Sequence, residues 1–397
     1  MRRSPRRVLT AVLIVAGAAI FAAAPAISAD LPKATQTFLK ELKLDPSILS
    51  GLDEELAVPQ EWIDGAKKEG AIRIGATWDP PQYRKMTAAF VERYPFIKHE
   101  YARGSRQDRT LKPLLALETS GRVTTDLIGS IGATYAKFKQ INALVDMRDL
   151  PGWKNVPDGM KDPEGLWVGQ RLRYWCMSYN TDTVKKEDLP KTWDDLLTNP
   201  IWRNGALALS NRPNLWFSNI WALDGYGEAW GKPYLEKLFG EVKPQLRKEG
   251  NNALLGLLIA GEYKAVIPGA DYRTKQYFLK KAPIAWHCPE PVPLAISELS
   301  IVKGNSHPYA SKLWVNWFLS KEGQIAQYYA NHAPPVHKDL QTPDFLSFAE
   351  EIIGKKVAFR DPVQLEEDLP KVFAVWNPLW DPSGRSTDKS ADKEDDD

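Results

Sequence analysis

Short apolar segments alternate with helical patterns from residue 71 onward. The strand-like runs lie at 72–76, 99–102 and 125–128, and helical spacing of apolar residues occurs at 83–94, 111–119 and 133–141. Strands that alternate with helices favour a parallel sheet covered on both faces. We therefore predict an α/β lobe in this part of the chain.

A second α/β series follows a long apolar run. The run at 167–180 is long for a single strand, which makes it a candidate for a segment that leaves one lobe and enters another. Strands are then predicted at 205–210, 264–267, 283–287, 294–296 and 299–302, and helices at 193–197, 213–221, 272–279, 308–319 and 323–329. The pattern predicts two discontinuous α/β lobes, one formed by 67–172 with 292–332 and the other by 173–291.

The two ends of the chain depart from this pattern. Residues 1–29 carry four arginines, an apolar stretch and then Pro25 and small residues, which is the order of a secretory signal peptide cleaved after Ala29. We expect a helical N-terminal extension at 30–66, a helical C-terminal extension at 333–381 with a helix near 345–353, and a disordered acidic tail at 382–397.

Charge and composition exclude several classes of function. Without residues 1–29, the chain has 48 basic and 50 acidic side chains, and this balance favours neither nucleic-acid nor membrane-surface binding. The five histidines have no metal-ligand spacing, and the sequence contains neither a nucleophile elbow nor a phosphate-binding glycine loop. We therefore expect no enzyme activity, no cofactor and no metal. Most of the fifteen tryptophans are interpreted as packing residues.

Several segments, in order and spacing, resemble one protein family. They are EGAIRI at 69–74, DLI at 126–128, YNTDTV at 179–184, LPKTWDDL at 189–196, AGEY at 260–263, GNSHPYA at 304–310 and FLSKEGQ at 318–324. Over about residues 65–332 the chain resembles the type 2 periplasmic solute-binding proteins of ABC importers, in their iron(III)-binding-like branch. No single segment is decisive, so the resemblance rests on the set.

The resemblance implies both a fold and a role. Two lobes joined by two crossing strands would close over a small ligand, with closure stabilised by contacts that the ligand makes to both lobes. The protein would be a periplasmic monomer that delivers its ligand to an ABC permease in the inner membrane. A ligand-sensing periplasmic partner of a membrane receptor is an alternative, because both roles need the same closing lobes.

The predicted ligand loops of lobe 1 follow its strands, because loop amides and helix N-termini converge at the carboxyl ends of strands. Trp78 either stacks on a flat ligand or anchors the lobe surface. The loop after Gly104 either binds an anion through amides and side chains or is a solvated charged turn. The candidate residues in lobe 1 are Thr77, Trp78, Arg103, Ser105, Arg106, Ser130 and Ile131.

Lobe 2 and the crossing strand supply the other candidates. The loop before Pro213 either binds a small anion at a helix N-terminus or is an ordinary cap. Arg171, Arg173 and Tyr174 lie on the crossing strand, where one can face the cleft and the others need not. The candidate ligand-binding residues here are Arg173, Ser210, Asn211, Arg212, Asp271 and Tyr272.

The residue types of these loops favour an organic anion. Iron-binding members of the family typically carry adjacent tyrosines in the lobe 2 loop, whereas this chain has Asp271 before Tyr272. A hard trivalent ion needs several anionic oxygen ligands, and the cleft loops offer few. Arginine binds carboxylates and phosphonates in a bidentate manner, and aromatic rings cover an apolar body. A ferric ion or ferric complex remains the alternative ligand.

The two cysteines have two possible states. Cys176 and Cys288 fall on segments interpreted as the crossing strands, which the family places side by side. An oxidising compartment permits a disulfide between them, and two unpaired buried thiols are the alternative.

Overall fold

The computed structural model describes residues 31–359 and 362–383. The predicted signal peptide lies outside these residues, as does the predicted acidic tail beyond residue 383. Among the described helices, none combines the length and the apolarity that crossing a membrane requires.

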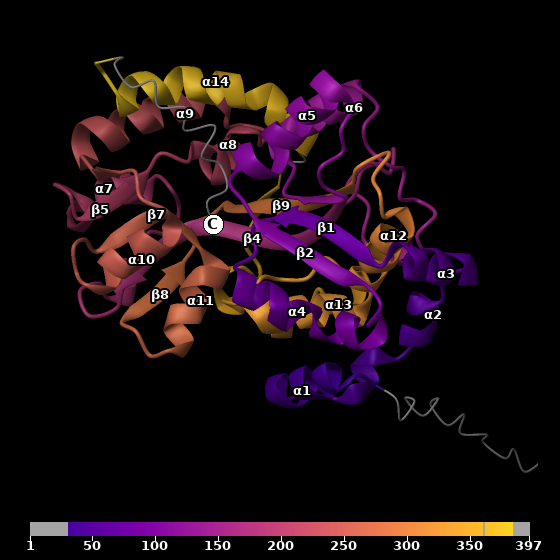
Figure 1. The fold of residues 1–397 in the computed structure, drawn as a ribbon. Coiled ribbons are helices and arrows are strands. Elements are labelled where there is room, and N and C mark those ends of the chain that lie inside the picture. Colours follow the sequence, from indigo (N-terminus) through magenta and orange to yellow (C-terminus); the bar gives the residue numbers. More distant parts are fainter. Residues whose placement is uncertain (1–30, 360–361, 384–397) are drawn as a thin grey trace, which may run out of the picture.

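One mixed sheet of ten strands runs through both lobes (Figure 1). Its strand order is β2-β1-β3-β9-β4-β7-β5-β6, with β10 added to β9 and β8 added to β4. The strands are β1 Ala71–Ala76, β2 Lys98–Arg103, β3 Leu127–Gly129, β4 Val168–Asn180, β5 Leu207–Ser210, β6 Gln245–Arg247, β7 Ala265–Ala270, β8 Ile284–His287, β9 Val292–Ile301 and β10 Val357–Phe359. The α/β fold class is confirmed, and β6 and β10 are strands that the sequence pattern did not predict.

Two long strands pass from one lobe to the other. The first half of β4 pairs antiparallel with β9, and its second half, from Trp175, pairs with β7 and β8. The end of β9 pairs with β3 in lobe 1. Every residue of β4 is buried, which accounts for its unbroken apolar character in the sequence. The return strands predicted separately at 294–296 and 299–302 form the single strand β9.

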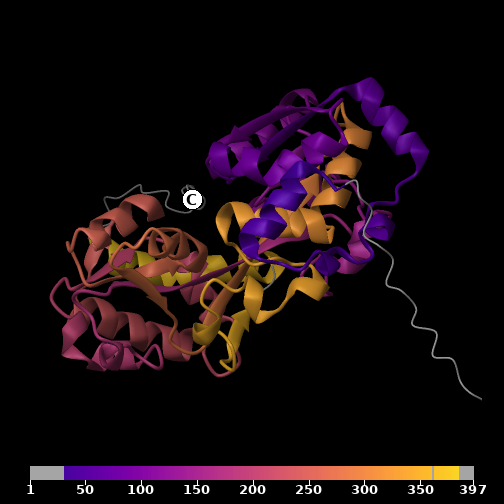
Figure 2. The ribbon, with the colours of Figure 1, turned by 90° about the horizontal axis from the view of Figure 1, so that it is seen from below.

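Helices cover both faces of each half of the sheet. In lobe 1 these are α4 Pro80–Arg93, α5 Lys112–Ser120, α6 Tyr135–Gln140, α12 Pro308–Phe318 and α13 Lys321–Asn331. In lobe 2 they are α7 Asp195–Thr198, α8 Phe217–Trp221, α9 Gly227–Lys237, α10 Asn251–Ile259 and α11 Asp271–Leu279. Figure 2 shows the two lobes as separate masses joined near the centre of the molecule. Helices α9 and α10 were not predicted.

The N-terminal extension is part of lobe 1. It consists of α1 Lys33–Leu42, α2 Leu52–Leu56 and α3 Gln60–Glu69, which pack on α12 and α13. The carboxylate of Glu322 is fully buried and accepts hydrogen bonds from Thr35 in α1 and Trp317 in α12, and it pairs with Arg93 at 2.6 Å. Since a buried charge is costly without partners, these bonds fix the extension to the lobe.

The C-terminal segment differs from the prediction. The described residues 345–353 form two short 3₁₀ turns and bends in place of the predicted helix. Tertiary contacts set this path, because Ser347 donates a hydrogen bond to the His332 carbonyl and Phe348 stacks on Trp286. A long helix follows, α14 Pro362–Trp380, which lies in the extension 333–381 that was predicted to be helical, although no individual helix was predicted at these positions.

Helix α14 contains two prolines, a residue type that usually interrupts a helix in its interior. Both Pro370 and Pro378 lie on its exposed face. Its buried side chains include Leu369, Val372, Trp376 and Trp380, a stripe with helical spacing. Solvent can hydrogen-bond the carbonyls that the prolines leave without an amide donor, so the apolar stripe decides the conformation.

Candidate functional site

A group of charged and aromatic side chains, most of them buried, lies where the two lobes meet on β4. Alternation along the strand places Arg171, Arg173 and Trp175 on one face of β4. The loop after β1 approaches this face from lobe 1, and the N-terminus of α11 approaches from lobe 2. We call the set the interlobe cluster; it comprises Thr77, Trp78, Asp79, Arg103, Arg171, Arg173, Trp175, Tyr272 and Arg273.

Arg171 lies at the centre of the interlobe cluster and is only 2% exposed. Its Nη2 donates a hydrogen bond to Thr77 Oγ1 at 2.9 Å. Its guanidinium carbon lies 5.7 Å from the Trp78 ring centre and 5.6 Å from that of Tyr272. Burial, together with the positive charges of Arg173 and Arg273, lowers the pKa of Arg171 to about 10. Three guanidinium groups therefore act on one another in a buried region.

The lobes are in direct contact across the interlobe cluster. Asp79 Oδ2 from lobe 1 pairs with Arg273 Nη1 from lobe 2 at 2.6 Å, and Asp79 Oδ1 lies 3.4 Å from Arg103 Nε. Beside this pair, Gln82 of α4 donates a hydrogen bond to Gln276 of α11 at 3.3 Å. Because these contacts join the two lobes beside the buried Arg171, we call this the closed arrangement of the lobes.

Asp271 and Tyr272 begin α11 and are both buried. The main-chain N–H of Tyr174 donates to Asp271 Oδ1 at 3.2 Å. Burial raises the pKa of Asp271 to about 7, against the effect of hydrogen bonds from the amides of Tyr272 and Tyr174. The carboxyl group therefore changes protonation near neutral pH.

Several buried polar atoms at or near the interlobe cluster have no hydrogen-bond partner within the described part of the chain. They are Nε1 of Trp78, Nε1 of Trp175, the Tyr272 hydroxyl, Oδ2 of Asp271 and Oγ of Ser210. Buried polar groups in native proteins are nearly always paired, and unpaired indole nitrogens also occur elsewhere in the described chain, at Trp202, Trp216 and Trp314. A polar ligand that enters between the lobes would provide the missing partners.

The other predicted residues of lobe 1 are held by local contacts. Ser105 Oγ donates to Asp108 at 2.9 Å, and the Arg106 carbonyl accepts from Thr110 Oγ1 at 2.7 Å. The Ser130 amide donates to the Glu298 carbonyl at 2.6 Å. Ile131 is 1% exposed and belongs to the lobe 1 core. Thr77, Trp78 and Arg103 are thus the predicted lobe 1 residues that belong to the interlobe cluster.

Trp78 packs in a different way from a ligand-stacking residue. Its ring lies 5.7 Å from Phe318, in an edge-on arrangement, and within 6.5 Å of Tyr83, Tyr101 and Trp314. Protein side chains therefore surround the indole in lobe 1. Its contribution to the site is its Nε1–H and its contact with Arg171.

The predicted loop of lobe 2 contacts the C-terminal helix. The Arg212 amide donates to the Ser210 carbonyl at 2.8 Å, which makes a tight turn after β5. Asn211 Oδ1 accepts a hydrogen bond from Trp376 Nε1 of α14 at 2.7 Å. This loop is thus fixed by a segment that lies more than 160 residues later in the chain.

Sequence reasoning selected only part of the interlobe cluster. Arg173 was predicted on the crossing strand. Arg171 and Trp175 lie two residues before and after it, and residues two apart in a strand share a face, so this alternation could have identified them. Asp79 and Arg273 were missed because they meet across the lobes at a separation of 194 residues. No local pattern reveals such a pair.

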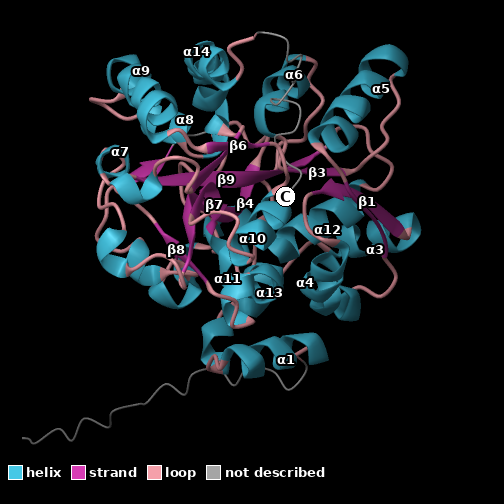
Figure 3. Cartoon of the chain, turned by 90° about the vertical axis from the view of Figure 1, so that its left-hand side faces the viewer, coloured by secondary structure: helices cyan, strands magenta, loops and turns pink. Residues whose placement is uncertain are grey.

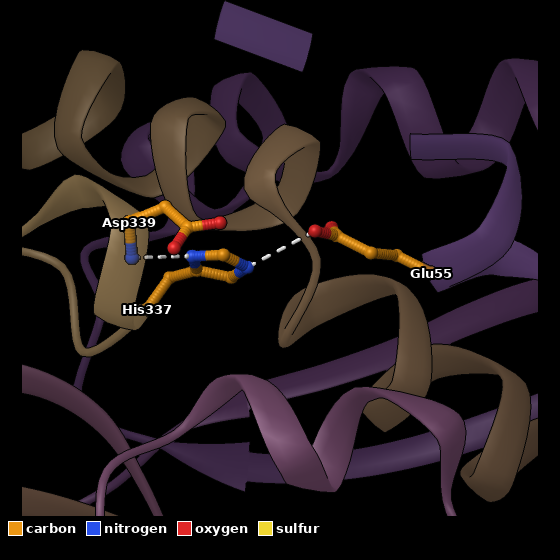
Figure 4. A group of neighbouring side chains, drawn as sticks. All are labelled: Glu55, His337 and Asp339. Carbon is orange, nitrogen blue, oxygen red and sulfur yellow. Dashed lines mark hydrogen bonds and ion pairs between the residues drawn. The ribbon is translucent and has the colours of Figure 1, made fainter. Parts of the chain in front are cut away.

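One compact group of metal-type ligands lies elsewhere among the described residues. Glu55, His337 and Asp339 meet where the N-terminal extension contacts the C-terminal segment (Figure 4). The Asp339 amide donates to His337 Nδ1, so Nε2 carries the proton toward Glu55 at 3.2 Å. Lys321 Nζ also lies 3.3 Å from Asp339. Neither imidazole nitrogen offers a free lone pair, so the group is a structural contact.

A pocket of about 290 Å³ lies in lobe 1, apart from the centre of the interlobe cluster. It is bounded by one face of β1 and β2 and by the start of α5. Its charged lining residues are Arg73, Glu100, Arg103, Asp108 and Arg109. Both signs of charge are present, so the pocket selects no class of ion.

A disulfide joins Cys176 of β4 to Cys288, which lies between β8 and β9. The two Cα atoms are 5.1 Å apart, and the chain contains no other cysteine. The structure thus contains the disulfide, and the alternative of two unpaired thiols does not apply.

Comparison with solved structures shows the same fold at low sequence identity. Iron-bound HitA from Pseudomonas aeruginosa is 17% identical, with a TM-score of 0.64 over 78% of this chain and 99% of that chain. Apo ferric ion-binding protein A from Pasteurella haemolytica is 16% identical, with a TM-score of 0.63 over 80% of this chain and 100% of that chain. The Trichodesmium protein IdiA (FutA), in complex with iron and citrate ligands, is 15% identical, with a TM-score of 0.62 over 79% of this chain and 100% of that chain.

A family model confirms the resemblance seen in the sequence. The model of bacterial extracellular solute-binding proteins matches residues 126–347, which is more than half of the chain. The matched region contains β4, β9, all of lobe 2 and the strand β3 of lobe 1. Proteins of this family are binding proteins and not enzymes, they act outside the cytoplasm, and they pass small molecules to membrane permeases. This chain belongs to the bacterial extracellular solute-binding proteins.

Proposed function

We propose that the protein is the periplasmic substrate-binding component of an ABC importer and that it captures a small organic anion at the interlobe cluster. The observation that carries this proposal is the gathering of buried guanidinium groups at the interlobe cluster. Arg171, Arg173 and Arg273 are at most 6% exposed, and burial together with the charges of Arg173 and Arg273 lowers the pKa of Arg171. An anion would reduce the cost of holding these charges together away from water.

The other polar groups agree with an anionic ligand. Two indole N–H groups and the Tyr272 hydroxyl are donors with no partner in the described chain, and carboxylate or phosphonate oxygens accept such bonds. The rings of Trp175 and Tyr272 meet edge-on at 6.4 Å and would cover an apolar part of the ligand. Closure would then be stabilised by contacts to both lobes at once.

A ferric complex is the second candidate. The three compared structures are named for iron or ferric-ion binding, and one is described with iron and citrate together. The buried Tyr272 hydroxyl, which has no partner in the described chain, is the observation in this chain that favours such a ligand. Phenolate oxygen is a hard ligand suited to ferric iron, but the surrounding arginines oppose a bare cation and favour an anionic complex.

The test is a thermal-shift screen of the mature, ligand-stripped protein, followed by calorimetry. The panel contains carboxylates, phosphonates, sugars, polyamines, amino acids, ferric nitrilotriacetate and ferric citrate. We expect one class of organic anion to raise the melting temperature, since selective binding stabilises the folded state. A shift with polyamines alone would contradict the proposal, and a shift with ferric compounds alone would support the second candidate.

Two variants of equal size make the screen specific for the site. Arg173→Met removes a guanidinium from the interlobe cluster, and we expect its affinity for the anion to fall about 10- to 150-fold, the loss of one charged hydrogen bond. Arg148→Met removes an exposed arginine that pairs with Asp146 in lobe 1 and should bind like the parent protein. Equal affinities in both variants would exclude this site.

A further inference from the structure

Helix α14 contacts both lobes. On the lobe 2 side it packs against α8, α9 and the short helix Pro213–Leu215. On the lobe 1 side it lies against α6 and the short helix Gly132–Thr134. Figures 1 and 3 both show α14 along the same side of the sheet as α8, α9 and α6. Separation of the lobes must therefore disturb one set of these contacts.

The lobe 2 contact has a defined anchor. Trp376 is fully buried, and its ring centre lies 6.3 Å from Phe217 and 5.4 Å from Phe239. Its indole N–H donates to Asn211 at 2.7 Å, in the turn that follows β5. Trp380 stacks on Trp376 one turn later, with the rings 14° from parallel. Aromatic burial and a buried hydrogen bond together hold the end of α14 on lobe 2.

The two short helices that α14 contacts follow directly after β3 and β5. These are positions where ligand loops of the two lobes were predicted from the sequence. The contact of α14 therefore connects the predicted loop of Ser130 and Ile131 with that of Ser210, Asn211 and Arg212. The helix therefore contacts both lobes along one side of the sheet, in addition to the Asp79–Arg273 pair near β4.

The same segment also contacts a crossing strand. Directly before α14, strand β10 pairs in parallel with residues Val292–Leu294 at the start of β9. The C-terminal segment is therefore attached to the strand that must bend when the lobes move, to lobe 2 through Trp376, and to lobe 1 through the contacts of α14. A rigid helix attached at these places transmits a force that opposes separation.

We propose that α14 is an interlobe strap that stabilises the closed arrangement in the absence of ligand, so that opening requires release of α14 from one lobe. The inference rests on the lobe movement of the proposed function but not on the identity of the solute. It assigns the C-terminal segment a role in control of access to the site. The energy that resists opening would come from the buried face of α14, and Trp376 is its largest anchor.

The test measures the lobe separation by single-molecule fluorescence transfer without any ligand. Dyes are attached to cysteines introduced as Lys98→Cys in lobe 1 and Lys185→Cys in lobe 2, both exposed positions. The native cysteines are bonded to each other and do not react. Trp376→Phe keeps most of the packing and removes the hydrogen bond to Asn211, whereas Trp376→Ala also removes the ring. Trp62→Ala is the control, because Trp62 is a buried tryptophan of α3, in the N-terminal extension.

The proposal requires a graded result. Trp376→Phe should raise the ratio of open to closed molecules about two- to tenfold, the equivalent of one hydrogen bond. Trp376→Ala should raise it further, and Trp62→Ala should leave it unchanged. Equal distance distributions in the parent and the folded Trp376→Phe protein, or equal shifts in the Trp376→Ala and Trp62→Ala proteins, would overturn it. The Phe variant keeps the test valid if the Ala variant does not fold.

Discussion

Replacement of Arg171 by methionine separates a binding role from a structural one. The fully buried guanidinium is costly, because burial lowers its pKa to about 10 from an ordinary value of 12.5. A shift of that size corresponds to about 3 kcal/mol of destabilisation at neutral pH, and this cost remains at every pH below the folded pKa. Methionine removes the cost and keeps an unbranched apolar stem between the rings of Trp78 and Tyr272.

The variant also loses an interaction that stabilises the folded state. The charged hydrogen bond to Thr77 contributes about 1.5–3 kcal/mol, which nearly offsets the gain. We therefore expect the free energy of unfolding of Arg171→Met to stay within about 2 kcal/mol of the parent value. The affinity for the anion should nevertheless fall about 10- to 150-fold, because a ligand contact with the guanidinium is lost.

The assays are urea unfolding of the ligand-free protein and calorimetry with the anion that the screen identifies. Arg93→Met is the matched control, because it removes an arginine that pairs with fully buried Glu322, far from the interlobe cluster. That control should lose about 3–5 kcal/mol of stability and keep its affinity. If Arg171→Met showed the same behaviour as the control, the reasoning would be refuted and Arg171 would be a structural residue.

Three further predictions concern protonation, the disulfide and metal. Ionisation of Asp271, whose pKa burial raises to about 7 from 3.8, disfavours the folded state as the pH rises between these values. The free energy of unfolding of Asp271→Asn relative to the parent should thus increase by about 4 kcal/mol from pH 4 to pH 8 in urea titrations, and a constant difference would contradict this. The disulfide closes a segment of 112 residues, so its reduction should cost about 4–5 kcal/mol in the same assay, and thiol titration of unfolded protein should find reactive thiols only after reduction. Dialysis against a chelator should leave the melting temperature unchanged, since both nitrogens of His337 are already hydrogen-bonded; a marked decrease would show a structural metal.

The fold was predictable where local patterns and tertiary structure agree. Strand β1 shows this, since Ile72 and Ile74 are buried on one face, and α4 follows it with helical spacing. Helix α14 shows the limit, because the sequence predicted a helical extension over 333–381 but did not locate this helix, which contains Pro370 and Pro378. Which face of a helix meets solvent decides whether a proline is tolerated, and a sequence gives that only indirectly.

The candidate site was predictable in its location but not in its pairings. The carboxyl ends of strands supplied Thr77 and Tyr272, and the crossing strand supplied Arg173; all three lie in the interlobe cluster. Ser105 and Asn211 were also predicted to bind ligand, but their side chains are hydrogen-bonded within the protein. Ser105 donates to the neighbouring Asp108, and Asn211 accepts from the distant Trp376. A loop side chain that a sequence presents as available can thus be engaged by another part of the protein.

The disulfide has a consequence for the axis about which the lobes turn. From Trp175 onward, β4 is held in lobe 2 by β7 and β8, and the Cys176–Cys288 bond adds a covalent tie there. Between residues 171–173 and 295–297, the crossing strands pair with each other and with no further strand among the described residues, and the Leu172 amide donates to the Pro334 carbonyl at 2.9 Å. Bending is easiest in this two-stranded stretch, which carries Arg171 and Arg173. These arginines would then lie at the pivot and keep their positions while the lobes move, so an anion would meet the same two charges when it enters the open protein and after the lobes close.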